Sequence, residues 1–252
     1  MVSFDTIPHE RLMTRLKQRI ADGSVLSLIE SFLKAGVMDG TSQWTPEAGA
    51  PQGAVLSPLL SNIYLNPLDH AVREAGFEMV RYADDFVLLC RTADEAARAL
   101  EFVRQWVAAN GLTLHATKTK IVDVRTEGFD FLGYHFVKHY RLPRKKSLAK
   151  LKDAIRAKTK RTSGDSLSCI VNDVNQTLRG WFAYFQNAWK TTFRPLDGWV
   201  RMRLRSILRK RARHRGRGRG LDHHRWPDAF FAEHGLYSLV TAHAQAVQSS
   251  RR

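Results

Sequence analysis

Apolar residues recur at helical spacing near the start of this chain and throughout its second half, whereas the middle has short apolar runs bounded by turn-forming residues. Spacings of three and four residues predict amphipathic helices. Two are predicted near the N-terminus, with apolar faces formed by Leu12, Leu16 and Ile20 in the first and by Val25, Leu28, Ile29 and Phe32 in the second. The polar residues 36–46 predict a loop after them.

The middle of the chain predicts a mixture of strands and helices. Ser57 and Pro58 suit the N-cap and the first position of a helix. Residues 79–82 and 86–90 predict two strands that meet at a tight turn on residues 83–85. A helix is expected over residues 92–110, ending at Gly111, and further strands over residues 120–124 and 129–137. This part therefore predicts an α+β fold with an antiparallel sheet.

Beyond residues 140–146 the pattern predicts helices and no strand. Three apolar faces are formed by Leu148, Leu151 and Ile155, by Val171, Val174, Leu178, Phe182 and Phe185, and by Val200, Leu204, Ile207 and Leu208. The opposite side of the third helix is expected to expose Arg201, Arg203, Arg205 and Arg209. Residues 209–219 predict a flexible basic loop, and residues 227–248 a last helix. We expect two domains, a mixed one over residues 1–142 and a helical bundle over residues 143–252.

The charge balance indicates a polyanionic partner. Forty Lys and Arg against 24 Asp and Glu give a formal net charge of +16 and a pI near 10.3, which is typical of nucleic-acid-binding proteins. A basic surface that serves solubility alone is the alternative. The two cysteines show no metal-ligand spacing, and no apolar run reaches the roughly 18 residues that a bilayer requires. We expect a cytoplasmic protein without a membrane partner, at most associated with the nucleoid or with an RNA–protein particle.

Asp84 and Asp85 stand at the tip of the predicted hairpin between two apolar strands. Adjacent carboxylates that are partly buried repel each other unless a cation neutralises them, and their hard oxygens suit Mg²⁺. A solvated Asp-Asp turn without a metal is the alternative.

Several motifs in this chain resemble those of group II intron reverse transcriptases/maturases, and they follow in that family's order. Tyr82-Ala83-Asp84-Asp85 is similar to the Y-A-D-D signature. The other matching segments are Gln52-Gly53 with Ser57-Pro58, Gly111-Leu112-Thr113-Leu114 with Lys118-Thr119-Lys120, Phe131-Leu132-Gly133-Tyr134, and Leu178-Arg179-Gly180-Trp181 with Tyr184-Phe185. The resemblance extends from Phe4 to Arg252.

The resemblance implies a right-hand polymerase palm followed by an all-α thumb bundle. It implies polymerisation with Mg²⁺ in a two-metal site, with Asp84 and Asp85 as metal ligands and Lys118 near the nucleotide phosphates; Lys118 as a solvated surface residue is the alternative. The implied nucleotide and template site comprises Phe4, Pro51, Gln52, Gly53, Tyr82 and Ala83. The implied primer grip comprises Phe131, Leu132, Gly133 and Tyr134. The implied partners are intron RNA, an RNA template with a DNA primer, and dNTPs.

The chain departs from the family pattern at its first residues. Phe4-Asp5-Thr6-Ile7-Pro8-His9 resembles the end of the motif that contains the family's first catalytic aspartate, and that aspartate would stand upstream of Met1. Asp5 matches the motif's second aspartate, which has a structural role. We therefore expect a palm without its first catalytic strand, an incomplete metal site, and a chain that by itself does not polymerise.

In the thumb, Trp181, Phe182, Phe185 and Trp189 are expected mainly in the bundle core and the cations on its surface. The RNA-binding residues are predicted to be Arg179, Trp181, Lys190, Arg194, Arg201, Arg205 and Arg209. Two functions remain open. One is an RNA-directed DNA polymerase and maturase, with this chain a fragment of a longer reading frame, a decayed element or half of a split protein. The other is a polymerase-inactive maturase that binds RNA and assists intron splicing.

Overall fold

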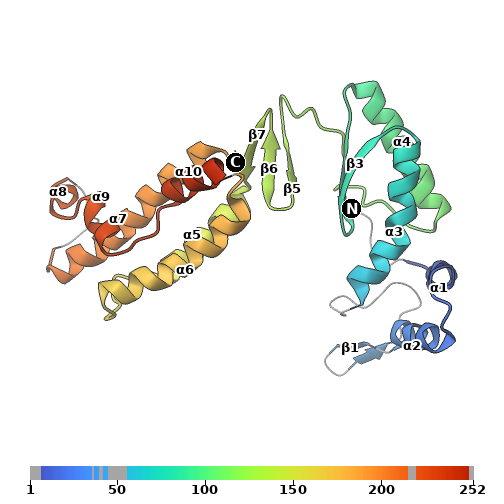
Figure 1. Cartoon of the computed structure of the whole chain (residues 1–252), viewed down its shortest axis with the longest axis horizontal. Helices are drawn as coiled ribbons and strands as arrows, with labels where there is room; N and C mark the ends of the chain where they lie inside the picture. The colour runs from blue at the N-terminus through green and yellow to red at the C-terminus, as the bar shows by residue number, and fades with distance from the viewer. Residues whose placement is uncertain (1–6, 36, 40–41, 45–55, 215–219, 250–252) are drawn as a thin grey trace. The chain divides into compact units, whose positions relative to one another are not determined.

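The computed structural model divides into two compact units, Met1–Ile121 and Val122–Arg252, which are described separately (Figure 1). It describes residues 7–35, 37–39, 42–44, 56–214 and 220–249. The units combine helices with small antiparallel sheets, which confirms the α+β class. None of the helices within these ranges is long and apolar enough to cross a membrane.

The first unit consists of helices and two β-hairpins. Its elements are α1 (His9–Lys17), α2 (Gly23–Lys34), β1 (Val37–Asp39), β2 (Ser42–Trp44), α3 (Ser57–Glu74), β3 (Glu78–Tyr82), β4 (Asp85–Leu89) and α4 (Ala93–Ala109). Strand β1 pairs with β2 and β3 with β4, both antiparallel. The hairpin β3–β4 lies against α3 and α4 (Figure 1).

The core of this unit lies where α1, α3 and α4 meet the hairpin. Its most deeply buried side chains include Leu12, Leu16, Tyr64, Leu65, Leu68, Val72 and Val103. Helix α4 begins where the Thr92 side chain accepts a hydrogen bond from the Glu95 amide, and the left-handed Gly111 (φ 69°) follows its end. The predicted hairpin and the helix between Thr92 and Gly111 are thus confirmed.

Three local predictions in the first unit are wrong. Val25, Leu28 and Phe32 of α2 are exposed, because α2 turns Leu33 into the core instead. Leu56, one residue before Ser57, is the N-cap of α3. Residues 120–124 form no strand and lie in turns and irregular chain, where a carboxylate of Asp123 accepts a hydrogen bond from the Arg125 amide.

The second unit begins with a three-stranded meander and continues as a helical bundle. Its elements are β5 (Phe129–Phe131), β6 (Tyr134–Val137), β7 (Tyr140–Pro143), α5 (Lys145–Lys158), α6 (Leu167–Phe185), the 3₁₀ turn η2 (Lys190–Thr192), α7 (Phe193–Arg211), α8 (Asp222–Arg225), α9 (Asp228–Glu233) and α10 (Leu239–Ser249). The strand order is β5-β6-β7, antiparallel throughout.

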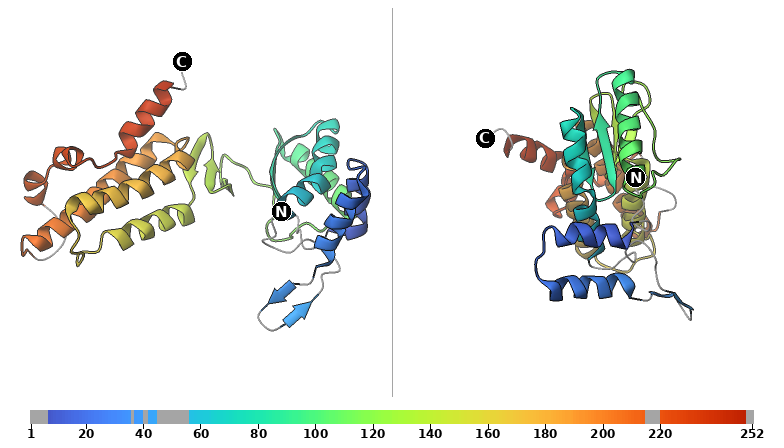
Figure 2. Two further views of the ribbon diagram at one scale, coloured as in Figure 1. Left: turned by 60° about the horizontal axis from the view of Figure 1, so that its bottom comes forward. Right: turned by 90° about the vertical axis from the view of Figure 1, so that its right-hand side faces the viewer.

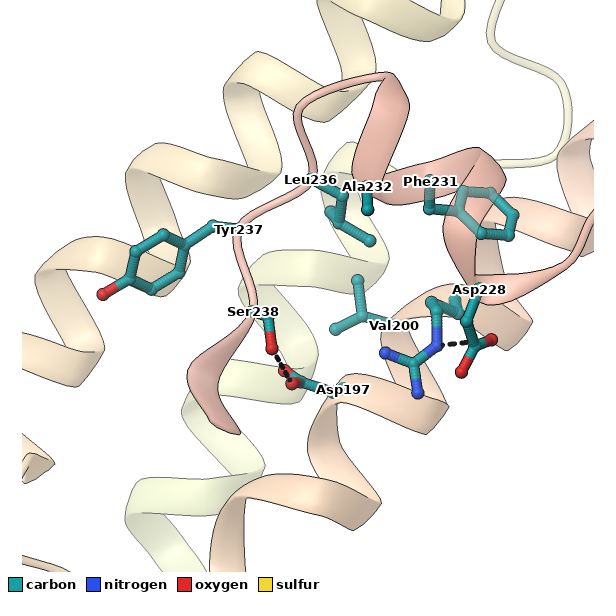
Figure 3. Close-up of a pocket in the computed structure, with 9 residues that line it drawn as sticks. Asp197, Val200, Asp228, Phe231, Ala232, Leu236, Tyr237 and Ser238 are labelled. Carbon is teal, nitrogen blue, oxygen red and sulfur yellow. Dashed lines mark hydrogen bonds and ion pairs between the residues drawn. The ribbon is translucent and has the colours of Figure 1, made fainter. Parts of the chain in front are cut away.

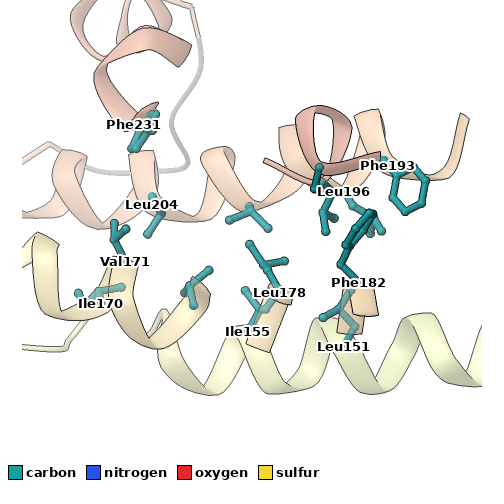
Figure 4. Close-up of a cluster of buried hydrophobic side chains, with 14 of the residues drawn as sticks. Leu151, Ile155, Ile170, Val171, Leu178, Phe182, Phe193, Leu196, Leu204 and Phe231 are labelled. Atoms are coloured by element: carbon teal, nitrogen blue, oxygen red, sulfur yellow. The ribbon is translucent and has the colours of Figure 1, made fainter. Parts of the chain in front are cut away.

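Helices α5, α6 and α7 enclose the core of the second unit, as Figure 2 shows from two sides. Figure 4 shows Ile155 of α5, Leu178 of α6 and Leu204 of α7 pointing into this common interior, and none of the three is exposed. The three helices predicted from apolar spacing are confirmed. Phe182 and Phe185 are buried as predicted, whereas the prediction for Trp189 is wrong, because its side chain is 37% exposed and lies outside the core cluster.

The structure corrects the expected elements at both ends of the bundle. The segment 129–137 is a hairpin rather than one strand, and β7 follows it where no strand was predicted. The single last helix is divided into α9 and α10 by Gly235, which adopts φ 75°. Asp197 of α7 then accepts hydrogen bonds from the Leu239 and Val240 amides and starts α10.

The expected boundary between residues 142 and 143 falls before the last residue of β7, whereas the compact units divide between Ile121 and Val122. Of the predicted basic loop 209–219, residues 209–211 belong to α7, and residues 215–219 lie outside the described part.

Candidate active site and nucleic-acid interface

The tip of the β3–β4 hairpin holds Asp84 and Asp85. Tyr82 pairs with Asp85 across the strands, which leaves Ala83 and Asp84 as the two turn residues. Ala83 has a φ of 53°, a conformation that costs a non-glycine residue roughly 1–2 kcal/mol. The surrounding structure must therefore hold this turn in place.

Arg81 supplies that restraint from the adjacent strand position. Its Nε and Nη2 donate to the two carboxylate oxygens of Asp69 on α3, at 2.7 and 2.5 Å. Its Nη1 donates at 2.8 Å to the Asn62 side chain and also to the Ala83 carbonyl. The side chain is largely buried, so α3 holds the backbone of the turn through a charge-assisted, bidentate contact.

The electrostatics of the turn favour a bound cation. Burial raises the pKa of Asp84, and the neighbouring Asp85 carboxylate raises it further. A backbone hydrogen bond and the charge of Lys118 lower the pKa of Asp84, but the net shift of this pKa is upward. Lys118 is thus within electrostatic reach of Asp84. A metal ion would favour the ionised carboxylate that burial disfavours.

The carboxylate pair fits Mg²⁺ by its hard oxygen atoms. In the part of the chain that the structure describes, no cluster of three or more Asp, Glu, His or Cys residues could hold a metal. Within these residues, Asp84 and Asp85 are thus not joined by a third side chain of this kind.

The remaining nucleotide-site predictions divide into two groups. Phe4, Pro51, Gln52 and Gly53 lie outside the described residues. Tyr82 is 66% exposed beside the turn, and Ala83 forms the turn itself, so both stand next to the carboxylates.

The predicted primer grip is the turn between β5 and β6. Leu132 and Gly133 both have positive φ, 47° and 80°, as a two-residue type I′ turn requires. The Tyr134 hydroxyl donates to the Tyr184 carbonyl, and the Tyr184 hydroxyl donates to the Leu132 carbonyl, each at 2.7 Å. The turn is therefore fixed to the end of α6 through Tyr184.

The predicted RNA-binding arginines of α7 require a correction. Arg205 is 2% exposed; it donates to the Trp226 carbonyl at 2.8 Å and to the Asp228 carboxylate at 2.6 Å. Arg201 also pairs with Asp228, at 2.8 Å, and Arg209 pairs with Asp222 at 2.6 Å. Figure 3 labels Asp228 and marks its ion pair with a dashed line. These arginines do not form an exposed row, because α8 and α9 cover that side of α7 and supply their carboxylate partners.

The other predicted contacts are distributed differently. Lys190 and Arg194 are exposed, and so is Arg179, whose guanidinium lies 5.0 Å from the Tyr237 ring centroid. Trp181 is only partly exposed and packs on Phe185.

Sequence reasoning missed two features of the site. The exposed Lys145, Lys146 and Lys150 place a basic face on α5, for which the signal was their spacing opposite Leu148 and Leu151. The contact between Arg81 and Asp69 had no local signal, because the partners belong to different elements.

Comparison with known proteins agrees with this geometry. Residues 2–136 match the family model described as reverse transcriptase (RNA-dependent DNA polymerase), and residues 148–226 match the group II intron maturase-specific domain. The chain therefore belongs to the reverse transcriptase family. Within it, the maturase-specific match makes the chain a member of the group II intron reverse transcriptases/maturases.

Individual relatives match shorter stretches. Protein YkfC of Escherichia coli K12 is 32% identical over 170 residues, 54% of this chain and 44% of YkfC. The group II intron-encoded protein LtrA of Lactococcus lactis subsp. cremoris is 44% identical over 78 residues, 31% of this chain and 13% of LtrA. Retron Ec86 reverse transcriptase of Escherichia coli is 31% identical over 81 residues, 31% of this chain and 25% of that protein. The chain thus spans less than half of each of these relatives.

Proposed function

We propose that this chain comprises palm residues and the RNA-binding thumb of an RNA-directed DNA polymerase that also acts as a group II intron maturase. The observation that supports this most strongly is the restrained turn with Asp84 and Asp85, in a chain that also matches the maturase-specific domain. In this proposal the palm comprises residues 1–142 and the thumb residues 143–252.

The proposed reaction is the attack of a primer 3′-hydroxyl on the α-phosphate of a dNTP. Two Mg²⁺ ions, when bound, would stabilise the attacking and leaving oxygens. Asp84 and Asp85 would hold metal, and Lys118 would neutralise charge on the pyrophosphate that departs. Arg81 would keep the turn in the conformation that presents both carboxylates.

The proposed nucleic-acid contacts lie on both units. Tyr82 and Ala83, together with Phe4, Pro51, Gln52 and Gly53, would contact the template and the incoming nucleotide. The turn formed by Phe131, Leu132, Gly133 and Tyr134 would hold the primer. Exposed Arg179, Lys190 and Arg194 would contact intron RNA.

The polymerase assignment is tested by primer extension. With an annealed RNA template and DNA primer, dNTPs and Mg²⁺, we expect no extension above background from the 252-residue chain, because Asp84 and Asp85 are an incomplete ligand set. We expect extension from a version joined to an upstream segment that supplies the family's first aspartate. In that version Asp84→Asn should abolish cDNA synthesis and leave RNA binding unchanged.

The exposed Asp94 of α4 provides the control, and Asp94→Asn should extend the primer like the parent. Unchanged cDNA yield from Asp84→Asn would show that the metal ligands lie elsewhere. Robust extension by the unmodified chain would show that another carboxylate completes the site.

A polymerase-inactive maturase is the second candidate. The basic face of α5 favours it, since RNA binding by the thumb needs no metal site. It is supported if the unmodified chain accelerates splicing of a group II intron RNA while its Asp84→Asn variant does so equally well.

A further inference from the structure

Three aromatic rings meet at one end of the second unit, outside its hydrophobic core. His139 and Tyr140 lie at the turn between β6 and β7, and Trp189 precedes η2. The Tyr140 and Trp189 ring centroids are 4.7 Å apart, those of His139 and Trp189 6.0 Å, and those of His139 and Tyr140 4.0 Å. We call these three residues the aromatic platform.

The platform is held by backbone as well as by ring contacts. The Trp189 amide donates to the Arg141 carbonyl at 2.7 Å, which ties the segment after α6 to β7. The rings therefore come from two segments far apart in sequence that are fixed to each other. Such a surface loses little conformational entropy when it binds a ligand.

The exposure of the platform distinguishes it from the core aromatics. Trp189 is 37% exposed and His139 is exposed, whereas Phe182, Phe185 and Phe193 of the same unit are buried. None of the three platform residues belongs to the core cluster. Their packing accordingly leaves aromatic surface available to a partner.

Cations flank the platform residues in the sequence. Lys138 precedes His139, Arg141 follows Tyr140, Lys190 follows Trp189, and all three cations are exposed. Among the described residues no carboxylate forms an ion pair with any of them. Aromatic faces beside cations suit a ligand that offers a flat ring and negative charge together, as a nucleotide does.

We infer that the platform of His139, Tyr140 and Trp189 binds an unpaired base of single-stranded RNA, with Lys138, Arg141 and Lys190 near its flanking phosphates. The inference rests on the proposed function and specifies the form of RNA that this surface takes. Bases inside a duplex are already stacked on their neighbours, so only an unpaired base can present its face. Stacking requires no particular base, and the platform should therefore accept all four.

Binding of fluorescently labelled RNA to the full chain tests the inference. The probes are a 12-nucleotide single strand and a blunt duplex of the same length, each titrated at several salt concentrations. Trp189→Leu keeps an apolar side chain but removes the aromatic face. We expect it to weaken single-strand binding roughly five- to hundredfold, the range found for loss of one stacked base. Duplex binding should not change, nor should the dependence of affinity on salt, because no phosphate contact is lost.

Three variants complete the experiment. Trp189→Phe restores an aromatic face and should recover most of the affinity. Trp199→Leu is the matched control, because Trp199 packs against the core with Lys152 and Arg156 near its ring; it should bind both probes like the parent. His139→Ala removes an exposed ring without disturbing the bundle. It therefore tests the platform even if circular dichroism shows that Trp189→Leu does not fold.

The outcomes separate this inference from the proposed function. Equal loss of single-strand and duplex binding in Trp189→Leu, or no loss in folded Trp189→Leu or His139→Ala, would overturn the platform and leave RNA binding by the thumb intact. A parent chain that binds neither probe would overturn both.

Discussion

Arg205 lies almost wholly inside the second unit, with its guanidinium carbon 5.1 Å from the Phe231 ring centroid. Its guanidinium donates hydrogen bonds to the Trp226 carbonyl and to the Asp228 carboxylate. Burial alone would raise the pKa of Asp228, but the hydrogen bond from Arg205 and the charges of Arg201 and Arg205 outweigh it, and the net pKa is lowered. Asp228 is thus held ionised by two arginines, which therefore stabilise the fold.

The prediction at the residue scale is that Arg205→Ala destabilises the protein. The change leaves the Trp226 carbonyl without its donor and Asp228 with one arginine fewer. The free energy of unfolding should fall by about 2–4 kcal/mol. Urea denaturation followed by tryptophan fluorescence measures it.

Lys210→Ala is the control for Arg205→Ala. Lys210 is exposed on the same helix, and its removal should change stability by less than about 0.5 kcal/mol. An Arg205→Ala variant that is as stable as the parent but binds RNA more weakly would contradict this structural role. It would indicate that Arg205 contacts RNA.

At the scale of elements, α5 rather than α7 presents a row of exposed cations. Lys145, Lys146 and Lys150 are exposed, while Leu151 and Ile155 of the same helix are buried. The lysines can therefore be removed without opening the core.

The prediction for α5 is that changing Lys145, Lys146 and Lys150 together to Gln weakens RNA binding in a salt-dependent manner. Each phosphate contact contributes about 0.7–0.9 to the slope of log affinity against log salt. If all three lysines contact phosphate, the slope should flatten by roughly two to three. Titrations at several salt concentrations give the slope, and circular dichroism confirms the fold.

The matched control removes the same charge from the first unit. Arg73, Arg98 and Arg104 are exposed on α3 and α4, and their joint change to Gln should leave the slope within error of the parent. Equal flattening in both variants would mean that net charge alone, and not the α5 face, binds the RNA.

At the scale of the whole molecule, the residues that the structure describes form two hydrophobic cores without a common residue. One contains Leu12, Leu65 and Leu68, and the other contains Ile155, Leu178 and Leu204. Each core belongs to one of the two compact units, so each unit should have its own stability.

The whole-molecule prediction is that a cavity in one core destabilises that unit only. Leu68→Ala and Leu204→Ala each remove a fully buried side chain and should cost about 2–5 kcal/mol. Hydrogen exchange with mass spectrometry should show faster exchange for peptides of the first unit in Leu68→Ala and of the second in Leu204→Ala. Faster exchange across both units in either variant would show that they unfold together.

The sequence by itself determined the features that depend on short-range pattern. The two strands around Asp84 follow from two apolar runs and a turn, and the faces of α5, α6 and α7 follow from spacings of three and four. The motif that contains Asp84 and Asp85 is continuous in sequence, so its hairpin could be predicted.

Only the tertiary structure decided which charged residues are available to a ligand. Periodicity placed Arg205 opposite the apolar stripe of α7, but its burial depends on Trp226 and Asp228, which lie beyond a turn of the chain. The aromatic platform likewise joins Tyr140 to Trp189. Helical spacing specifies which residues share a face, whereas the segment that packs on that face is set by the balance of burial and hydrogen bonding over the whole unit. For this reason the helices could be predicted from the sequence, and the exposure of the charged residues on them could not.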